Sequence, residues 1–116
     1  MKIEIPGIDV EKALELYDDD IELYIDVLKS WAANTPEALD KLRNVTAETL
    51  PNYAVAVHGI KGTSTAIGAT EANRLALKLE QMAKAGDLSS VLANNEAFLK
   101  YTEELMENVR NYLKTL

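Results

Sequence analysis

The sequence predicts an all-α protein: an antiparallel up-down four-helix bundle with an additional short N-terminal helix. Ala and Leu are plentiful whereas aromatic residues make up only 6% of the chain, and this balance favours helices over strands. Apolar residues recur at helical spacing, and no segment shows the sustained alternation of a β-strand. Three prolines and five glycines punctuate the sequence, and most of them fall where helix ends are expected. Short connections between long helices then predict antiparallel neighbours.

The first two expected helices begin at aspartates. Asp9 can cap a short helix that runs to about Tyr17. The acidic run at residues 18–20 ends this helix and caps a second one, and we expect a solvated cap there rather than a cation site. The apolar stripes of the two helices are Val10, Ala13, Leu14 and Tyr17, followed by Ile21, Tyr24, Leu28 and Trp31.

Thr35 and Pro36 predict the start of a third helix. Threonine is a good N-cap, and proline is favoured at the first helical position because its missing N–H is not needed there. We expect this helix to loosen between residues 44 and 49. Its apolar residues are Ala38, Leu39, Leu42 and Val45.

Three further helices follow. Pro51 opens a fourth helix that runs to about Ala66, and Gly68 ends it as a C-cap. Gly86 and Asp87 then stop the fifth helix and cap the last one. Ser64 lies on the apolar stripe of the fourth helix, as a small residue for close helix packing. The three stripes are Tyr53, Val57, Ile60, Ser64 and Ile67; Ala72, Leu75, Leu79 and Met82; and Val91, Asn95, Phe98, Thr102, Leu105, Val109, Tyr112 and Leu116.

The composition fits one domain over residues 1–116 and excludes several functions. Twelve basic against nineteen acidic side chains give a net charge of −7, so we expect neither nucleic-acid nor membrane binding. The absence of cysteine excludes disulfides, thiolate zinc sites and cysteine nucleophiles. The N-terminus lacks the apolar region of a signal peptide, and the longest apolar run, residues 53–57, is too short to span a membrane. We therefore expect a cytoplasmic protein, and a monomer.

His58 is the only histidine, and therefore the only candidate for imidazole chemistry. On a helical wheel, His58, Lys61, Gly62 and Thr65 cluster at roughly 140° from the apolar stripe, so we expect His58 to be exposed. An exposed imidazole is largely neutral at pH 7, which leaves a ring nitrogen free to act as a nucleophile. Acyl-transfer catalysis would need a second histidine, a cysteine or an oxyanion-stabilising group, and the sequence shows none of these. A lone nucleophile can still accept a phosphoryl group from a partner that supplies the metal. An exposed histidine without a role is the alternative.

Two neighbours of His58 fit this chemistry. Lys61, one turn further on, is placed to interact with phosphoryl oxygens as a point charge, with an ordinary solvated lysine as the alternative. Gly62 lies on the same side, although a glycine inside a helix costs about 1 kcal/mol relative to alanine. Its presence indicates that a partner's active-site loop approaches the backbone closely, with a helix irregularity as the alternative.

The segment 58–68 resembles the motif of histidine-containing phosphotransfer (HPt) domains, His-x-(Leu/Ile)-Lys-Gly-x-(Ser/Ala)-x-x-(apolar)-Gly. The matching residues are His58, Ile60, Lys61, Gly62, Ser64, Ile67 and Gly68. Further likeness lies at residues 7–10, 79–80 and 86–87, so it extends over essentially the whole chain. The resemblance implies a phosphorelay intermediate that takes a phosphoryl group from a receiver-domain aspartate, holds it on histidine and passes it to another receiver.

The resemblance also implies roles for individual residues and partners. His58 would be the phosphoacceptor, Lys61 the phosphoryl stabiliser and Gly62 the gap that admits the partner, with Gly59 and Thr65 beside it in the partner-binding surface. Gly59 departs from the family, which usually has a side chain there, and two glycines within one turn cost about 2 kcal/mol of local helix stability. The partners would be response-regulator receiver domains and a hybrid histidine kinase. The Mg²⁺ would belong to the receiver's carboxylates, with no cofactor on this chain and no kinase activity of its own.

Glu80 is a candidate orienter of the imidazole. His58 lies ten residues before Gly68 and Glu80 twelve after it, so two antiparallel helices bring them nearly level. A carboxylate hydrogen-bonded to one ring nitrogen fixes the tautomer and makes the other nitrogen more basic. The alternative is a surface ion pair of Glu80 with Arg74 or Lys84.

Two other functions are compatible with the sequence. One is a helical interaction or scaffold bundle whose histidine has no role. The other is the phosphoacceptor domain of a chemotaxis-type histidine kinase, which shares the fold and the motif but takes its phosphoryl group from a kinase catalytic domain. Phosphorylation of His58 by a receiver domain distinguishes these possibilities from a phosphorelay carrier.

Overall fold

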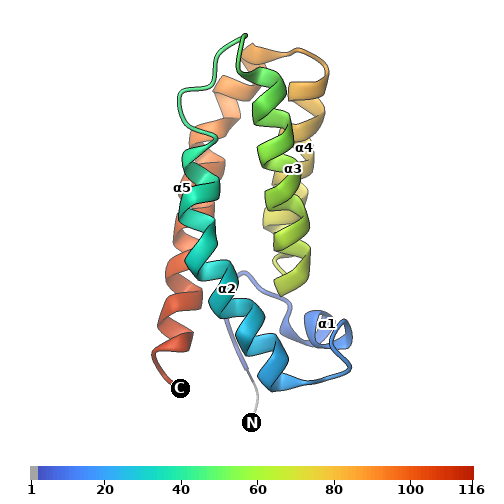
Figure 1. Ribbon diagram of the computed structural model, residues 1–116, viewed down its shortest axis with the longest axis vertical. Helices are drawn as coiled ribbons and strands as arrows, with labels where there is room; N and C mark the ends of the chain where they lie inside the picture. Colours follow the sequence, from blue (N-terminus) through green and yellow to red (C-terminus); the bar gives the residue numbers. More distant parts are fainter. Residues whose placement is uncertain (1–2) are drawn as a thin grey trace.

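The computed structural model describes residues 3–116, which form five helices and no strand. The four long helices run alternately up and down, and the short N-terminal helix lies at one end of the bundle (Figure 1). This arrangement confirms the predicted all-α bundle. No helix in the described part of the chain has the length and hydropathy that a membrane span needs. The helices are α1 (Val10–Glu15), α2 (Ile21–Asp40), α3 (Leu50–Ile67), α4 (Thr70–Lys84) and α5 (Leu88–Leu113).

The predicted helix start at Thr35 is wrong, because α2 continues through Thr35 and Pro36 to Asp40. The Thr35 hydroxyl donates to the carbonyl of Trp31, at 2.5 Å, and so acts inside the helix rather than as its cap. An interior proline costs a helix about 3 kcal/mol. Pro36 is tolerated because burial of the continuous apolar face of α2 offsets that cost. The residues of that face are Tyr24, Leu28, Trp31, Ala32, Thr35 and Leu39.

The starts of α1, α2 and α5 follow the predicted capping by aspartate. The side chains of Asp9, Asp20 and Asp87 each accept a hydrogen bond at 3.1 Å from a backbone N–H three residues further on. Asp18 and Asp19 both have positive φ, 52° and 60°, and form the turn between α1 and α2. The acidic run is thus a turn and a helix cap.

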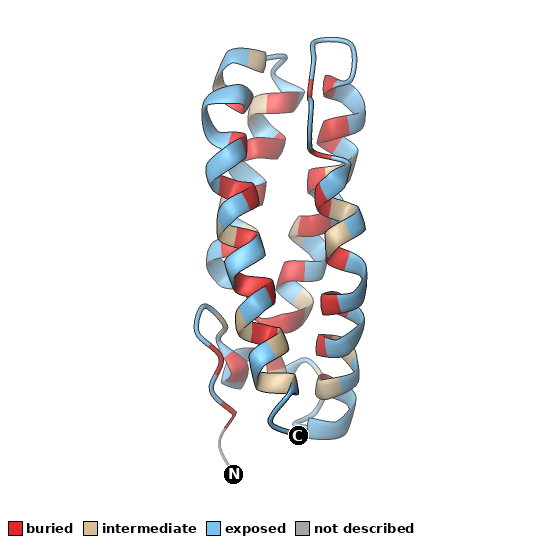
Figure 2. Ribbon diagram, turned by 90° about the vertical axis from the view of Figure 1, so that its left-hand side faces the viewer, coloured by how far each residue is buried: buried red, intermediate tan, exposed pale blue. Residues whose placement is uncertain are grey.

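Buried side chains lie on the inner faces of the long helices (Figure 2). Ser64 is fully buried on α3, as its small size on the apolar stripe predicted. Two expected stripe residues are exposed instead. Ile21 is the first residue of α2, and Leu116 lies beyond the end of α5, so neither faces a neighbouring helix across the core.

Hydrogen bonds from other elements hold both ends of α3, the helix that contains His58. Near its start, the Tyr53 hydroxyl donates to the buried side chain of Asn95 on α5, at 2.8 Å. At its end, the hydroxyls of Tyr17 and Tyr24 donate to the carbonyls of residues 66 and 67, at 2.7 and 2.8 Å. The bonds from Tyr17 and Tyr24 satisfy backbone carbonyls that the end of a helix otherwise leaves without a partner. The helix that contains His58 is therefore anchored at both ends.

Candidate functional site

His58 lies in the middle of α3 on the side away from the core. Its side chain is 63% exposed, while Val57 and Ile60 on either side of it in the buried stripe are almost fully covered. The structure thus confirms the exposed placement that the helical wheel predicts. An imidazole in this position is accessible to another protein.

Glu80 of α4 contacts the imidazole directly. Its Oε2 lies 2.6 Å from His58 Nδ1, although the glutamate side chain is only 3% exposed. The two residues are level because α3 and α4 run antiparallel around Gly68, as their sequence distances predicted. A carboxylate on Nδ1 favours the tautomer with the proton on that nitrogen. The other ring nitrogen, Nε2, has no hydrogen-bond partner among residues 3–116.

Two lysines also bind the Glu80 carboxylate. Lys61 Nζ donates to Oε1 at 2.7 Å, and Lys84 Nζ lies 3.1 Å from Oε2. Arg74, the other cation considered as a partner of Glu80, pairs with Glu71 instead. The ion pair of Glu80 with Lys84 is thus present, but Glu80 is buried and also binds His58 and Lys61, so its three partners come from both helices.

The Glu80 carboxylate stays ionised in this environment. The hydrogen bond from Lys61 is the largest cause that lowers its pKa, and Lys84 and His58 lower it further. Burial acts in the opposite direction, and the balance moves the pKa of Glu80 from 4.5 to about 2. The site therefore contains one fixed negative charge, two ammonium groups and an imidazole.

Gly59 and Gly62 leave the surface around His58 uncovered. Both are exposed, and a Cβ added at either would meet no atom within 4 Å in the described structure. Neither glycine is needed for packing inside the chain. Because α3 is a continuous α-helix over its whole length, the structure also gives no support to a helix irregularity at Gly62.

Asn73 of α4 is a neighbour of the site that sequence reasoning missed. Its side-chain amide donates to the Thr65 hydroxyl at 2.7 Å and to the carbonyl of Lys61 at 3.1 Å. Thr65 is exposed on the His58 side, and its hydroxyl also donates to that carbonyl, at 3.2 Å. The distances of Lys61 and Asn73 from Gly68 are similar, so the reasoning that placed Glu80 could also have found this contact.

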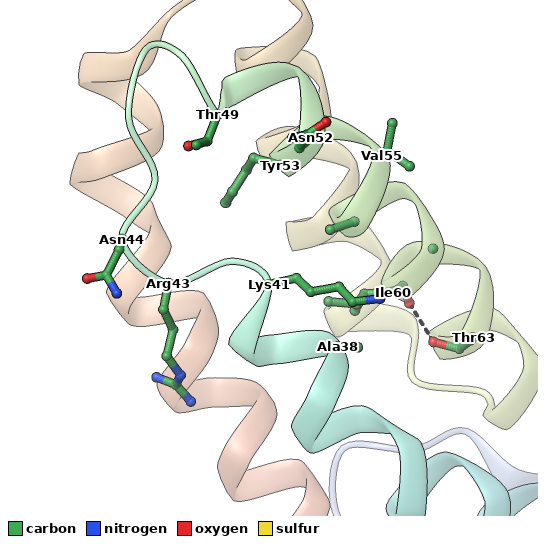
Figure 3. A pocket seen from close by; sticks show the side chains of 12 residues that line it. Ala38, Lys41, Arg43, Asn44, Thr49, Asn52, Tyr53, Val55, Ile60 and Thr63 are labelled. Carbon is green, nitrogen blue, oxygen red and sulfur yellow. Dashed lines mark hydrogen bonds between the residues drawn. The ribbon is translucent and has the colours of Figure 1, made fainter.

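A groove of about 700 Å³ lies between the end of α2, the 41–49 connection and α3 (Figure 3). Ala38 and Lys41 line it from the α2 side, and Val55, Gly59 and Thr63 line it from α3. Gly59 directly precedes Ile60 of the core stripe and directly follows His58. Gly59 therefore links the groove to the site, whereas the imidazole itself contacts Glu80 of α4. No group of three or more His, Asp or Glu side chains in the described residues could hold a metal ion.

The family model of the Hpt domain matches residues 26–113, a span that includes α3, α4 and every residue of this site. The chain therefore belongs to the Hpt domain family, as the motif around His58 indicated. Hpt domains carry out histidine phosphotransfer in two-component phosphorelays, where they interact with receiver domains and kinases. Searches of curated proteins and of solved structures found no significant match.

Proposed function

We propose that His58 is the phosphoacceptor of a phosphorelay, taking a phosphoryl group from an aspartyl phosphate on one receiver domain and passing it to another. The observation that carries this proposal is the 2.6 Å contact between Nδ1 and Glu80 Oε2. With the proton held on Nδ1, the lone pair of the ring lies on Nε2. That nitrogen has no partner within the described chain, so it is free to act as the nucleophile.

The transfer needs no proton acceptor on this chain. Nε2 attacks phosphorus in line, the N–P bond forms as the bond to the aspartate oxygen breaks, and the aspartate leaves as a carboxylate. The imidazole acquires positive charge during this step. The ionised Glu80, hydrogen-bonded to Nδ1–H, stabilises that charge and so supports both the forward and the reverse transfer.

Two cations would neutralise the transferring group. We expect Mg²⁺ on the carboxylates of the receiver domain, with Lys61 as the cation that this chain supplies. In the structure Lys61 Nζ is bound to Glu80 Oε1 at 2.7 Å. Lys61 must therefore turn away from the carboxylate to reach a phosphoryl oxygen.

The surface around His58 fits the approach of a partner. Gly59, directly after His58, and Gly62, about one turn further on, leave bare helix backbone beside the imidazole, and Thr65 adds a small side chain. We propose that the receiver's active-site loop lies near Gly62. The neighbouring groove, with exposed Val55 at its edge, extends this surface along α3.

Transfer from a labelled receiver domain tests this function. Wild type and His58→Gln are mixed with phosphorylated receiver and Mg²⁺, and we expect acid-labile, alkali-stable label on wild type only. His58→Gln should melt like wild type because the side chain is exposed. Label that persists on the variant would exclude His58 as the nucleophile. Label from a kinase catalytic domain but from no receiver would favour the chemotaxis-type alternative, and label from neither would favour a scaffold.

A further inference from the structure

Two lysine ammonium groups contact the Glu80 carboxylate, although one would be enough to neutralise its charge. The carboxylate is 3% exposed and contacts two ammonium groups, Lys61 at 2.7 Å and Lys84 at 3.1 Å, in addition to His58. A buried carboxylate left without a cation is strongly destabilised. With two lysines present, one can leave and the charge of Glu80 is still paired.

The two lysines differ in where they are anchored. Lys61 is on α3, one turn after His58, whereas Lys84 is on α4, one turn after Glu80. Lys61 thus shares a helix face with the nucleophile, and Lys84 is fixed beside the carboxylate. A phosphoryl group on Nε2 adds up to two negative charges, which compete with Glu80 for the ammonium of Lys61 on the same helix face.

We propose that Lys84 is a positioning residue that allows Lys61 to change partner. Lys84 keeps Glu80 paired while Lys61 moves from Oε1 to the phosphoryl oxygens. Without Lys84, this movement would leave the positively charged, phosphorylated imidazole as the sole cation beside the buried Glu80 carboxylate, so Lys61 would be held more tightly on Glu80. The inference rests on the proposed function, because it concerns the phosphorylated state of His58.

Phosphoramidate allows a test that needs no receiver domain. Its N–P bond breaks as the bond between phosphorus and Nε2 forms, and ammonia is released. The lifetime of the phosphohistidine is then followed by ³¹P NMR. A cation on the phosphoryl oxygens stabilises the phosphohistidine more than the loose transition state of its hydrolysis, in which these oxygens lose charge. Losing that cation should therefore shorten the lifetime.

We expect Lys84→Met to shorten the phosphohistidine lifetime roughly three- to tenfold, the range of one partly exposed charged contact. Lys84→Arg should restore a lifetime close to that of wild type. The matched control is Lys78→Met, which removes an exposed lysine from the same helix that acts on Glu71 rather than on Glu80. This control should leave the lifetime unchanged.

A double-mutant cycle tests whether Lys84 acts through Lys61. Lys61→Met alone should shorten the lifetime, and adding Lys84→Met should then have no further effect. An unchanged lifetime in Lys84→Met, a loss that Lys84→Arg does not restore, or an equal loss in the Lys61→Met background would each overturn the positioning role. If the lifetimes behave as expected but no receiver transfers label, the proposed function fails while the partner exchange stands.

Discussion

At the residue scale, the site is organised by a carboxylate rather than by the histidine. Glu80 binds the imidazole and both lysines, so one buried side chain from α4 sets the positions of three groups on the surface. Antiparallel helices and sequence distances predicted that Glu80 would lie level with His58. The sequence did not show that Glu80 is buried or that Lys84 and Lys61 share it, because both depend on how closely α3 and α4 pack.

Glu80→Gln should slow transfer from a receiver by about tenfold, the lower end of the loss seen when the carboxylate behind a metal-bound histidine is removed. The glutamine keeps a hydrogen-bond acceptor but not the charge that stabilises the developing imidazolium. The rate of label transfer under single-turnover conditions measures this effect. Glu71→Gln is the matched control, since that residue is exposed on the same helix and pairs with Arg74 rather than with a residue of the site. Equal rates for Glu80→Gln and wild type would contradict the role of the carboxylate.

The lowered pKa of Glu80 also predicts an acid-sensitive stability. Its folded pKa of about 2 lies below the ordinary value of 4.5, so the stabilisation is present above pH 4.5 and is lost as the pH falls towards 2. Wild type should therefore lose roughly 1–3 kcal/mol more than Glu80→Gln over this range. Denaturant unfolding at pH 7, 4.5 and 3 measures the difference. Parallel pH dependence in the two proteins would rule out this contribution.

At the element scale, α3 combines firmly held ends with an uncovered middle. Tyr17, Tyr24 and Tyr53 fix the ends through hydrogen bonds, and the two interior glycines lie where nothing packs against them. The bounds of this helix followed closely from Pro51 and Gly68. The continuity of α2 could not be predicted from the sequence. The local preference of Thr35 and Pro36 for a helix start is outweighed by burial of one face of α2, and that burial is seen only in the folded bundle.

The glycines of α3 should respond differently to alanine. Gly59→Ala and Gly62→Ala should each raise the free energy of unfolding by about 0.5–1 kcal/mol, because the added Cβ meets open space and helix propensity improves. Gly68→Ala should lower it by more than about 1 kcal/mol, since φ is +83° and the Cβ would collide with the backbone of Asp9. Thermal and denaturant unfolding measure all three.

Gly62→Gln separates stability from docking. Its fold should be intact, but its bulk should block the approach of the receiver and reduce transfer. Phosphorylation by phosphoramidate, which needs no docking surface, should remain near the wild-type rate. Transfer from the receiver at an unchanged rate would contradict a close approach at Gly62.

At the scale of the whole molecule, the bundle supports the site without taking part in its chemistry. Asn95 on α5 links two other segments, accepting from Tyr53 and donating to the carbonyl of Leu42, both at 2.8 Å. The up-down architecture followed from helix spacing and short connections. The buried hydrogen bonds by which Asn95 connects α5 to α3 and to the end of α2 could not be predicted from the sequence, because an asparagine on an apolar stripe gives no indication of its partners.

Asn95→Ala should therefore lower stability without changing the chemistry. Two buried hydrogen bonds are lost and the Tyr53 hydroxyl is left without its acceptor, so the free energy of unfolding should fall by about 1–3 kcal/mol. Transfer to His58 measured well below the melting temperature should stay close to wild type. A transfer defect as large as that of Glu80→Gln would mean that the site depends on the far side of the bundle.

The most direct test of the central claim is to determine which nitrogen carries the phosphoryl group after transfer from a receiver domain. The chain is labelled with ¹⁵N at histidine, phosphorylated by the receiver and Mg²⁺, and examined for ³¹P–¹⁵N coupling. We expect coupling to Nε2 of His58, with the proton of Nδ1 still present and hydrogen-bonded to Glu80. Coupling to Nδ1, or phosphorylation on a residue other than His58, would contradict this expectation.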